Sequence, residues 1–290
     1  MDITIVCVPF QVDVARWGCA GGPQALLDTG LIGRIEATGH RVRDVVWVDL
    51  PKSERTRDSV TNLGRIARRT AGAVRDALTG SQRLVLVLEG DCTHAVGPIG
   101  GLEQAKGHPG VVWFDAHGDL NTMETTTTGF LGGLPYAVAL GWDLEDWRMA
   151  AGLEPPVRPE AAALLGTSDL DPAERAALER YPILHMDASQ MQQSGVGGRV
   201  LAALKPRALE ARHWYMHLDL DVAGPEELPG GMTPAPYWPP RQHLIEAVGA
   251  AAQAVPIAVL GLAVYNPALD VDGRGARLAL DLAVAALEKL

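Results

Sequence analysis

Short runs of apolar, mostly β-branched residues recur along the chain and predict the strands of a sheet. Most of these runs are continuous rather than alternating, which is typical of strands that are covered on both faces, as in a parallel sheet. The predicted strands are residues 3–8, 42–48, 83–88, 111–114, 162–165, 183–185, 214–220 and 257–264.

Stretches with apolar residues at helical spacing lie between these runs and predict helices. One of them begins behind Asp171, a favoured N-cap residue type, with Pro172 at the first helical position. The predicted helices are residues 24–38, 61–78, 172–179, 241–254 and 277–287. Strands that alternate with helices indicate βαβ units. We therefore predict an α/β fold, a three-layer αβα sandwich around a doubly wound, mostly parallel sheet of about eight strands, in a single domain over residues 1–290.

The composition narrows the class of protein. Hydrophobic residues make up 47% and charged residues 21% of the 290 positions, which favours a folded core over disorder. The net charge of -10 argues against a general nucleic-acid binder but suits a cationic substrate. Three cysteines do not form a disulfide framework, and we find neither a signal peptide nor an apolar run of membrane-spanning length. We therefore expect a cytoplasmic protein without a membrane partner.

Three of the predicted strands run into acidic or metal-binding residues at their carboxyl ends. In open α/β sheets, binding sites lie at the carboxyl ends of the strands, so we expect these three ends to meet in one crevice. The residues at the three ends are Glu89, Asp91 and Cys92; Asp115, His117 and Asp119; and Asp219 and Asp221.

The spacing of Asp115, His117 and Asp119 suits metal binding, because alternate residues of an extended segment point the same way. Carboxylates with an imidazole suit Mn²⁺ or a similar ion better than a structural zinc site. With Asp219 and Asp221, the ligands exceed the need of one ion, so carboxylates would bridge two ions about 3.5–4 Å apart, which hold a hydroxide at neutral pH. Either motif alone also occurs as a cap or turn, but the two together favour a metal site.

These motifs, in this order, resemble the arginase (ureohydrolase) family along nearly the whole chain. Gly90-Asp91-Cys92-Thr93 resembles the family's Gly-Gly-Asp-His-Ser, and Asp219-Leu-Asp221 resembles its Asp-x-Asp motif. Asp115-Ala-His117-Gly-Asp119 is the family's Asp-Ala-His-x-Asp signature. Residues 121–133 and 166–174 are similar to the arginase segments that bind the amino acid end of the substrate.

The resemblance implies an arginase-like fold and two divalent metal ions, with Mn²⁺ as the family's metal. A bridging hydroxide would cleave a linear C–N bond of an amidino or guanidino amino acid, such as arginine or N-hydroxyarginine. The family is often trimeric or hexameric, which implies a homo-oligomer. The implied ligands of one ion are Cys92, Asp115, Asp119 and Asp219, and those of the other are Asp115, His117, Asp219 and Asp221.

The resemblance also assigns roles around the metal ions. Asp119 would orient the hydroxide and pass on its proton, which makes it the implied catalytic residue. Asn121 and Thr128 match positions that bind the substrate α-carboxylate. Asp171 and Glu174 match positions that bind its α-amino group, Glu174 through water.

One departure from the family pattern concerns the metal ligands. Cys92 stands where the family usually has a histidine ligand, and a thiolate shifts the preference towards zinc-like ions. Cys92 is either a ligand or a buried, inert residue, and His94 is an alternative ligand two positions on. A minority branch of the family that acts on N-hydroxylated arginine resembles this chain at Cys92 and in residues 128–133.

Two further departures concern catalysis. Gly132 stands where arginases have a proton-shuttle histidine, and Val264 stands where they have the glutamate that pairs with the guanidinium. We interpret Val264 as a core residue of its strand and expect Tyr265 to point away from the site. Two hypotheses follow: a hydrolase, or a non-catalytic relative that binds metal or an amino acid. A third hypothesis, a deacetylase of related fold with one zinc ion, is weaker, because such a site would not need both groups of ligands.

Overall fold

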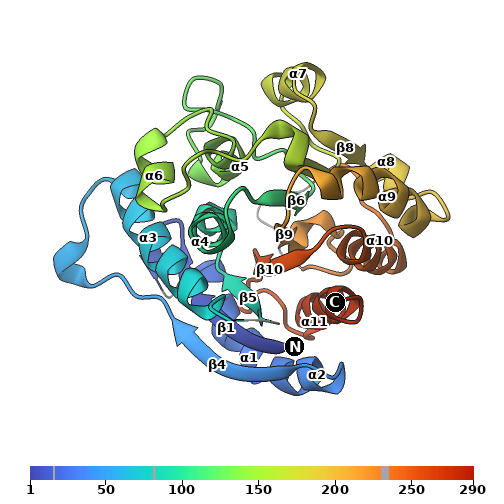
Figure 1. The fold of residues 1–290 in the computed structure, drawn as a ribbon, viewed down its shortest axis with the longest axis horizontal. Coiled ribbons are helices and arrows are strands. Elements are labelled where there is room, and N and C mark those ends of the chain that lie inside the picture. Colours follow the sequence, from blue (N-terminus) through green and yellow to red (C-terminus); the bar gives the residue numbers. More distant parts are fainter. Residues whose placement is uncertain (16, 81–82, 230–234) are drawn as a thin grey trace.

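A parallel sheet of eight strands forms the centre of the molecule (Figure 1). The computed structural model describes residues 1–15, 17–80, 83–229 and 235–290. The strand order is β4-β1-β5-β10-β9-β6-β7-β8, and all neighbouring strands run parallel, as predicted. The strands are β1 (Asp2–Val8), β4 (Arg41–Trp47), β5 (Arg83–Glu89), β6 (Gly110–Phe114), β7 (Ala162–Thr167), β8 (Leu184–Asp187), β9 (Trp214–Asp219) and β10 (Ile257–Ala263).

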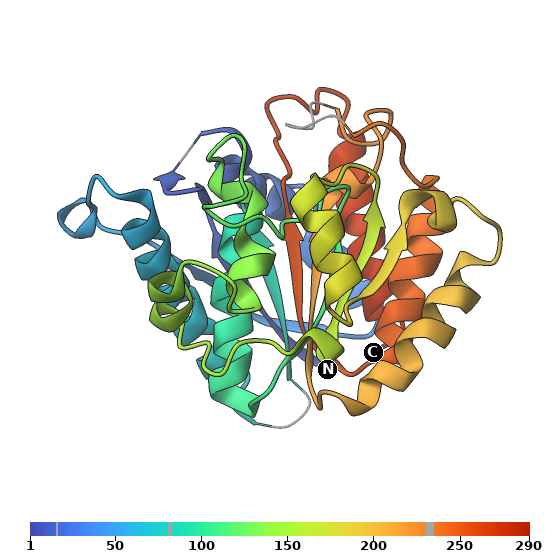
Figure 2. The same cartoon turned by 90° about the horizontal axis from the view of Figure 1, so that it is seen from above.

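Helices cover both faces of the sheet and complete the predicted three-layer sandwich (Figure 2). One face carries α3 (Ser59–Ala77), α4 (Val96–Lys106), α5 (Pro135–Ala139) and α6 (Glu145–Ala150). The other face carries α1 (Gly22–Asp28), α2 (Leu31–Ala37), α9 (Val196–Leu204), α10 (Arg241–Ala254) and α11 (Arg274–Leu287). The remaining helices, near β8, are α7 (Pro172–Arg180) and α8 (Ala188–Met191), and a short antiparallel pair is β2 (Phe10–Gln11) with β3 (Val14–Ala15).

Local sequence signals explain several of these elements. Asp58 caps α3, because its side chain accepts a hydrogen bond from the backbone N–H of Thr61 at 2.9 Å. The predicted start of α7 is confirmed, and Asp171 and Glu174 form a reciprocal capping box there. None of the helices in the described part of the chain has the length and hydrophobicity that a membrane crossing requires.

The helix prediction was wrong in two respects. Residues 24–38 form two helices rather than one, because Gly30 adopts a left-handed conformation with φ of 87° between α1 and α2. The pattern also missed α4 and α9, together with the short helices α5, α6 and α8. Residues 96–102 of α4 are all buried, so this segment shows no amphipathic pattern. In α9 the buried residues Val196, Val200 and Leu204 do have helical spacing, but Gly197 and Gly198 lower the helix propensity of the segment.

Candidate metal centre

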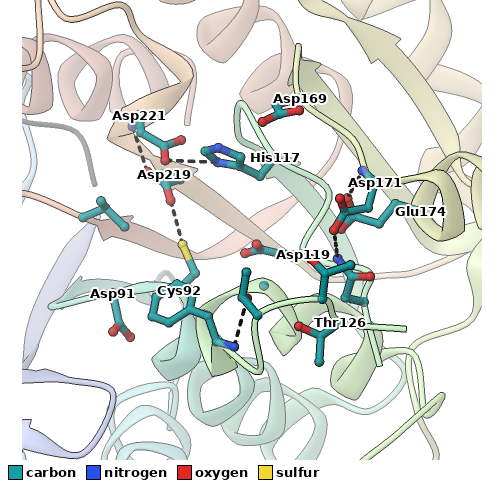
Figure 3. A pocket seen from close by; sticks show the side chains of 17 residues that line it. Asp91, Cys92, His117, Asp119, Thr126, Asp169, Asp171, Glu174, Asp219 and Asp221 are labelled. Carbon is teal, nitrogen blue, oxygen red and sulfur yellow. Dashed lines mark hydrogen bonds and ion pairs between the residues drawn. The ribbon is translucent and has the colours of Figure 1, made fainter. Parts of the chain in front are cut away.

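The carboxyl ends of β5, β6 and β9 meet at one cavity of about 260 Å³, as the sequence predicted (Figure 3). Asp115 is 1% exposed and is not among the residues that line the cavity. The other predicted site residues line it: Cys92, His117, Asp119, Asn121, Thr128, Asp171, Glu174, Asp219 and Asp221.

One group of potential ligands contains Cys92, Asp115 and Asp119, which are all buried. One ligand atom from each lies within 4.8 Å of the others. The Sγ of Cys92 also lies 2.8 Å from Oδ2 of Asp219. Cys92 begins a short 3₁₀ helix, Cys92–Ala95, which follows β5 after Gly90 and Asp91, and its thiol points towards Asp219 at the end of β9 (Figure 3).

The second group contains Asp115, His117 and Asp221, whose ligand atoms likewise lie within 4.8 Å of one another. The Nδ1 of His117 lies 3.3 Å from Asp115 Oδ1 and 3.2 Å from Asp221 Oδ2. Asp219 is oriented by the backbone N–H of Asp221, which donates to its Oδ1 at 2.7 Å. Because Asp115 belongs to both groups and Asp219 contacts Cys92, the groups form one continuous cluster.

The electrostatics of this cluster are unfavourable without a cation. Burial, reinforced by the neighbouring carboxylates, raises the pKa of Asp115, Asp119 and Asp219. Burial and the same carboxylates also raise the pKa of the Cys92 thiol. Burial disfavours a charged His117, but its contacts with Asp115 and Asp221 outweigh this and raise its pKa to about 12.

Two residues of the cavity hold unusual backbone conformations. Asp119 has φ of 51° and Val264 has φ of 63°, in the left-handed region that a β-branched residue rarely occupies. Such strain tends to persist at functional sites, where the surroundings impose it. The interpretation of Val264 as a core residue is confirmed in part: the side chain is buried in a hydrophobic core cluster, but the residue lies just beyond the end of β10 and also lines the cavity. Tyr265 does point elsewhere: its hydroxyl donates to Asp270 at 3.0 Å.

Three of the predicted substrate-binding residues, Asn121, Asp171 and Glu174, are joined by hydrogen bonds at the start of α7. Asn121 donates from Nδ2 to Asp171 Oδ2 at 2.8 Å. Both carboxylate oxygens of Glu174 already accept backbone hydrogen bonds, from Leu120 at 3.0 Å and from Asp171 at 2.9 Å. Glu174 therefore ties the segment after Asp119 to α7. Thr128, on the opposite segment, accepts a hydrogen bond from the N–H of Phe130 at 3.2 Å.

Gly132 and His94 have clear structural settings. A Cβ atom at Gly132 would overlap the ring of Phe130, so this aromatic ring occupies the space into which a side chain at 132 would extend. His94 points away from the ligand cluster: its Nε2 contacts the backbone oxygen of Phe10 at 2.9 Å. In this arrangement Cys92, and not His94, faces the cavity.

Three residues that contact the site were not singled out as functional from the sequence. Trp113 donates from Nε1 to Asp115 Oδ2 at 2.9 Å, and the His217 Nε2 lies 3.3 Å from Cys92 Sγ. Phe130 lines the cavity. Trp113 and His217 lie two residues before a ligand on β6 and β9, so strand alternation places them on the same face as Asp115 and Asp219. That spacing was the available signal.

Comparison with known proteins now identifies the family. The sequence model described as Arginase family matches residues 1–288. The chain belongs to the arginase family. The arginase of Bacillus caldovelox is 30% identical, with 97% of this chain and 96% of that protein covered, and human arginase-1 is 31% identical over 82% of this chain and 74% of that protein. The structure is also similar to solved structures of arginases. The crystal structure of Bacillus subtilis arginase superposes with a TM-score of 0.88 and is 26% identical in sequence, with 99% of this chain and 98% of that chain covered.

Proposed function

We propose that this arginase-family chain is a two-metal amidinohydrolase that cleaves a linear C–N bond of an amidino or guanidino amino acid. The observation that carries the proposal is the cluster of buried thiol and carboxylate groups with a partly exposed imidazole at the cavity. Cys92, Asp115, Asp119 and Asp219 would hold one divalent ion, and Asp115, His117, Asp219 and Asp221 would hold the other, with Mn²⁺ in both positions.

The residues of the cluster fit divalent cations. Buried carboxylates that raise one another's pKa repel when ionised, and a cation relieves that repulsion. Asp119 Oδ2 is a buried polar atom for which the described residues provide no hydrogen-bond partner. Buried polar atoms are normally paired, so an atom of this kind beside two ligand groups is best explained by a ligand or metal.

When bound, the metal ions supply an activated water at neutral pH. The chain's own residues supply the remaining functions. Asp119, with its free Oδ2 at the base of the cavity, accepts the proton of the attacking water and passes it on. Asn121 and Thr128 bind the substrate's α-carboxylate, and Asp171 and Glu174 bind its α-amino group, Glu174 through water because its oxygens already accept backbone N–H groups.

The wall of the cavity favours an N-hydroxyguanidino over a guanidino substrate. Phe130 fills the place of a side chain at Gly132, so this position provides no proton donor for the leaving group. Val264 presents an apolar side chain to the cavity, where a guanidinium cation would need an anionic partner. An N-hydroxyguanidine is less basic and carries its own hydroxyl, so it depends less on both missing groups.

The same two positions also support a second candidate, a non-catalytic relative that binds metal or an amino acid. A general acid contributes about 10²–10⁴-fold to a rate, so its absence at Gly132 weakens the catalytic proposal. We favour the hydrolase because the cluster has more potential ligands than a single bound metal ion requires. In either case we propose a single domain over residues 1–290 that acts in the cytoplasm as a homo-oligomer, a trimer or a hexamer.

The deciding experiment loads the purified protein with Mn²⁺ and measures bound metal together with urea or hydroxyurea release from arginine and N-hydroxyarginine. We expect two metal ions per chain and faster turnover of N-hydroxyarginine. Two bound ions without turnover of either compound would support the non-catalytic candidate. Absence of bound metal would refute both the hydrolase and the metal-binding protein.

A variant of the cavity wall tests the substrate preference. Val264→Glu should raise turnover of arginine relative to N-hydroxyarginine, because it restores an anion beside the cationic guanidinium. Val264→Gln is the matched control, since it has nearly the same size without the charge. Equal kcat/KM ratios for the two variants would rule out the charge at this position as the cause of the preference.

A further inference from the structure

Asp91 brings a carboxylate to the cavity that belongs to neither group of potential ligands. The residue directly precedes Cys92 and is buried. Figure 3 shows its carboxylate pointing away from the Cys92 thiol and from Asp219. Buried carboxylates need polar partners, so the contacts of Asp91 must lie on the side away from the ligand cluster.

Both carboxylate oxygens of Asp91 accept hydrogen bonds, and the donors come from two separate segments. Oδ1 accepts from the backbone N–H of Thr93 at 3.1 Å and also from the Thr93 hydroxyl. Oδ2 accepts from the backbone N–H of Val12 at 2.6 Å. Val12 lies in the turn between β2 and β3, 79 residues earlier in the chain. One side chain therefore joins the N-terminal hairpin, β2 with β3, to the turn that carries Cys92.

The N-terminal hairpin contacts the same turn at a second point. The backbone oxygen of Phe10 accepts a hydrogen bond from Nε2 of His94 at 2.9 Å, and it packs so closely on Gly90 that a Cβ atom there would overlap it. Val12 itself has φ of 52°, in the left-handed region that β-branched residues rarely adopt. Such a conformation persists only where the surroundings impose it, and the short bond to Asp91 is one such constraint.

These bonds determine where the backbone of Cys92 lies. The bond between Asp91 Oδ1 and the N–H of Thr93 closes a ring around the Cys92 backbone, and the bond to Val12 fixes that ring relative to the hairpin. A cysteine side chain has a single rotatable bond to its sulfur, so the sulfur cannot compensate for a displaced backbone as a longer side chain could. Metal–sulfur distances are short, about 2.3 Å for zinc. A small shift of this turn should therefore remove the sulfur from a bound ion.

We propose that Asp91 is a positioning residue that, through its bond to the N-terminal hairpin, holds Cys92 where its sulfur reaches a metal ion. The proposal rests on the proposed metal-binding function. In this role Asp91 touches neither the ion nor the substrate. The carboxylate ligands lie at the ends of β6 and β9, which pair with other strands of the central sheet and not with the hairpin. Loss of the bond should therefore affect the sulfur ligand selectively.

Cobalt binding to the purified protein tests this role without any substrate. A sulfur ligand of Co²⁺ gives a charge-transfer band in the near ultraviolet, which Cys92→Ala should abolish. Asp91→Asn keeps the size of the side chain, but its amide has one acceptor atom and cannot serve both Thr93 and Val12. This variant should lose most of the band and bind the first Co²⁺ ion about 10-fold more weakly. It should still bind two Co²⁺ ions at saturation, because the carboxylate ligands remain.

Asp13→Ala is the matched control within the hairpin. Asp13 accepts hydrogen bonds from Nδ2 of Asn62 at 2.7 Å and from the Ser59 hydroxyl at 3.2 Å, both on α3. Its loss should lower the melting temperature but leave the sulfur band unchanged, because the bond between Val12 and Asp91 remains. A band that weakens as much in Asp13→Ala as in Asp91→Asn would assign the effect to a general loss of stability and overturn the proposal.

Thr93→Val is the milder variant, because it keeps the shape of the side chain and removes only the hydroxyl bond to Asp91. It should weaken the band by less than Asp91→Asn. An unchanged band in Asp91→Asn, or in Thr93→Val if that variant alone folds, would overturn the proposal. Two bound Co²⁺ ions without a sulfur band in the unmodified protein would also overturn it while leaving the metal-binding function intact. Absence of Co²⁺ binding would refute both.

Discussion

Buried aspartates occur in two regions of this molecule, and their surroundings drive their pKa values in opposite directions. In the ligand cluster, burial and neighbouring carboxylates raise the pKa of Asp115, Asp119 and Asp219. At the start of α11, burial also opposes the charge of Asp270, but hydrogen bonds from the backbone N–H groups of Ala276 and Gly275 and from a tyrosine hydroxyl outweigh it and lower the pKa.

The difference separates carboxylates that stabilise the fold from carboxylates that the fold must hold in place. The charged carboxylate of Asp270 stabilises the fold, because it accepts hydrogen bonds from Tyr265 and from the backbone N–H of Gly275. These bonds hold the segment between Val264 and α11 in place. The cluster carboxylates are buried and lie close to one another, and both conditions disfavour their charges in the metal-free fold. The ends of the strands hold them close together, and the proposed metal ions would relieve their repulsion.

The largest effect should follow from removing one charge of the cluster. Asp219→Asn should weaken binding of Mn²⁺ by more than about 100-fold, because loss of a shared ligand exceeds the usual cost of losing a supporting contact. The same variant, free of metal, should unfold at a higher temperature than the metal-free parent, because one repelling charge is gone. Calorimetric titration and thermal unfolding in the presence of a chelator measure the two changes.

Asp169→Asn is the matched control, because Asp169 lines the same cavity but belongs to neither ligand group. It should leave both the metal affinity and the stability of the metal-free protein close to those of the parent. If Asp219→Asn lowers the stability of the metal-free protein instead, the charge of Asp219 is not a destabilising feature and the contrast with Asp270 does not hold.

The sequence predicted the residues of the cluster but not the residues that pack and hydrogen-bond behind them. Asp115, His117 and Asp119 could be found because alternate positions after an apolar run share a direction, and that pattern is local. The hydrogen bond from Tyr215 on β9 to Glu89 on β5 depends on β10 lying between these two strands, although β10 is the last strand in the chain. No local pattern encodes that strand order.

The cavity wall was predictable only in part. That Gly132 provides no proton donor could be read from the sequence, but the overlap of its missing side chain with Phe130 needed the fold of the loop. Val264 looked like the last residue of an apolar strand. In the structure its backbone turns into the left-handed region just after β10, which places it at the cavity. Hydrophobic patterns do not report such a turn at a valine.

Removing the charge of Asp270 should have the opposite outcome to Asp219→Asn. Asp270→Ala deletes a carboxylate that accepts three hydrogen bonds, and hydrogen bonds to a charged group contribute about 1.5–3 kcal/mol. We therefore expect the free energy of unfolding to fall by roughly that amount, with Mn²⁺ affinity unchanged. Urea unfolding and metal titration of the same samples give both values. A loss of Mn²⁺ affinity without a loss of stability would mean that Asp270 supports metal binding rather than the fold.

The smallest effect, on the order of 1 kcal/mol, should appear in the pH dependence of stability of the metal-free protein. Asp270 has a lowered folded pKa, so its contribution is present above the unfolded value of about 4 and is lost as the pH falls through the folded value. Asp115, Asp119 and Asp219 have raised folded pKa values, so their contribution is present below about pH 4 and is lost as the pH rises through those values.

Urea unfolding across this pH range, with chelator present, separates the two regions. The stability difference between the parent and Asp270→Asn should shrink as the pH falls below about 4. The advantage of Asp219→Asn over the parent should grow as the pH rises from about 4 towards neutrality, and saturating Mn²⁺ should abolish it. Parallel pH profiles for the parent and both variants would mean that the surroundings of these aspartates do not differ in the way their hydrogen bonds indicate.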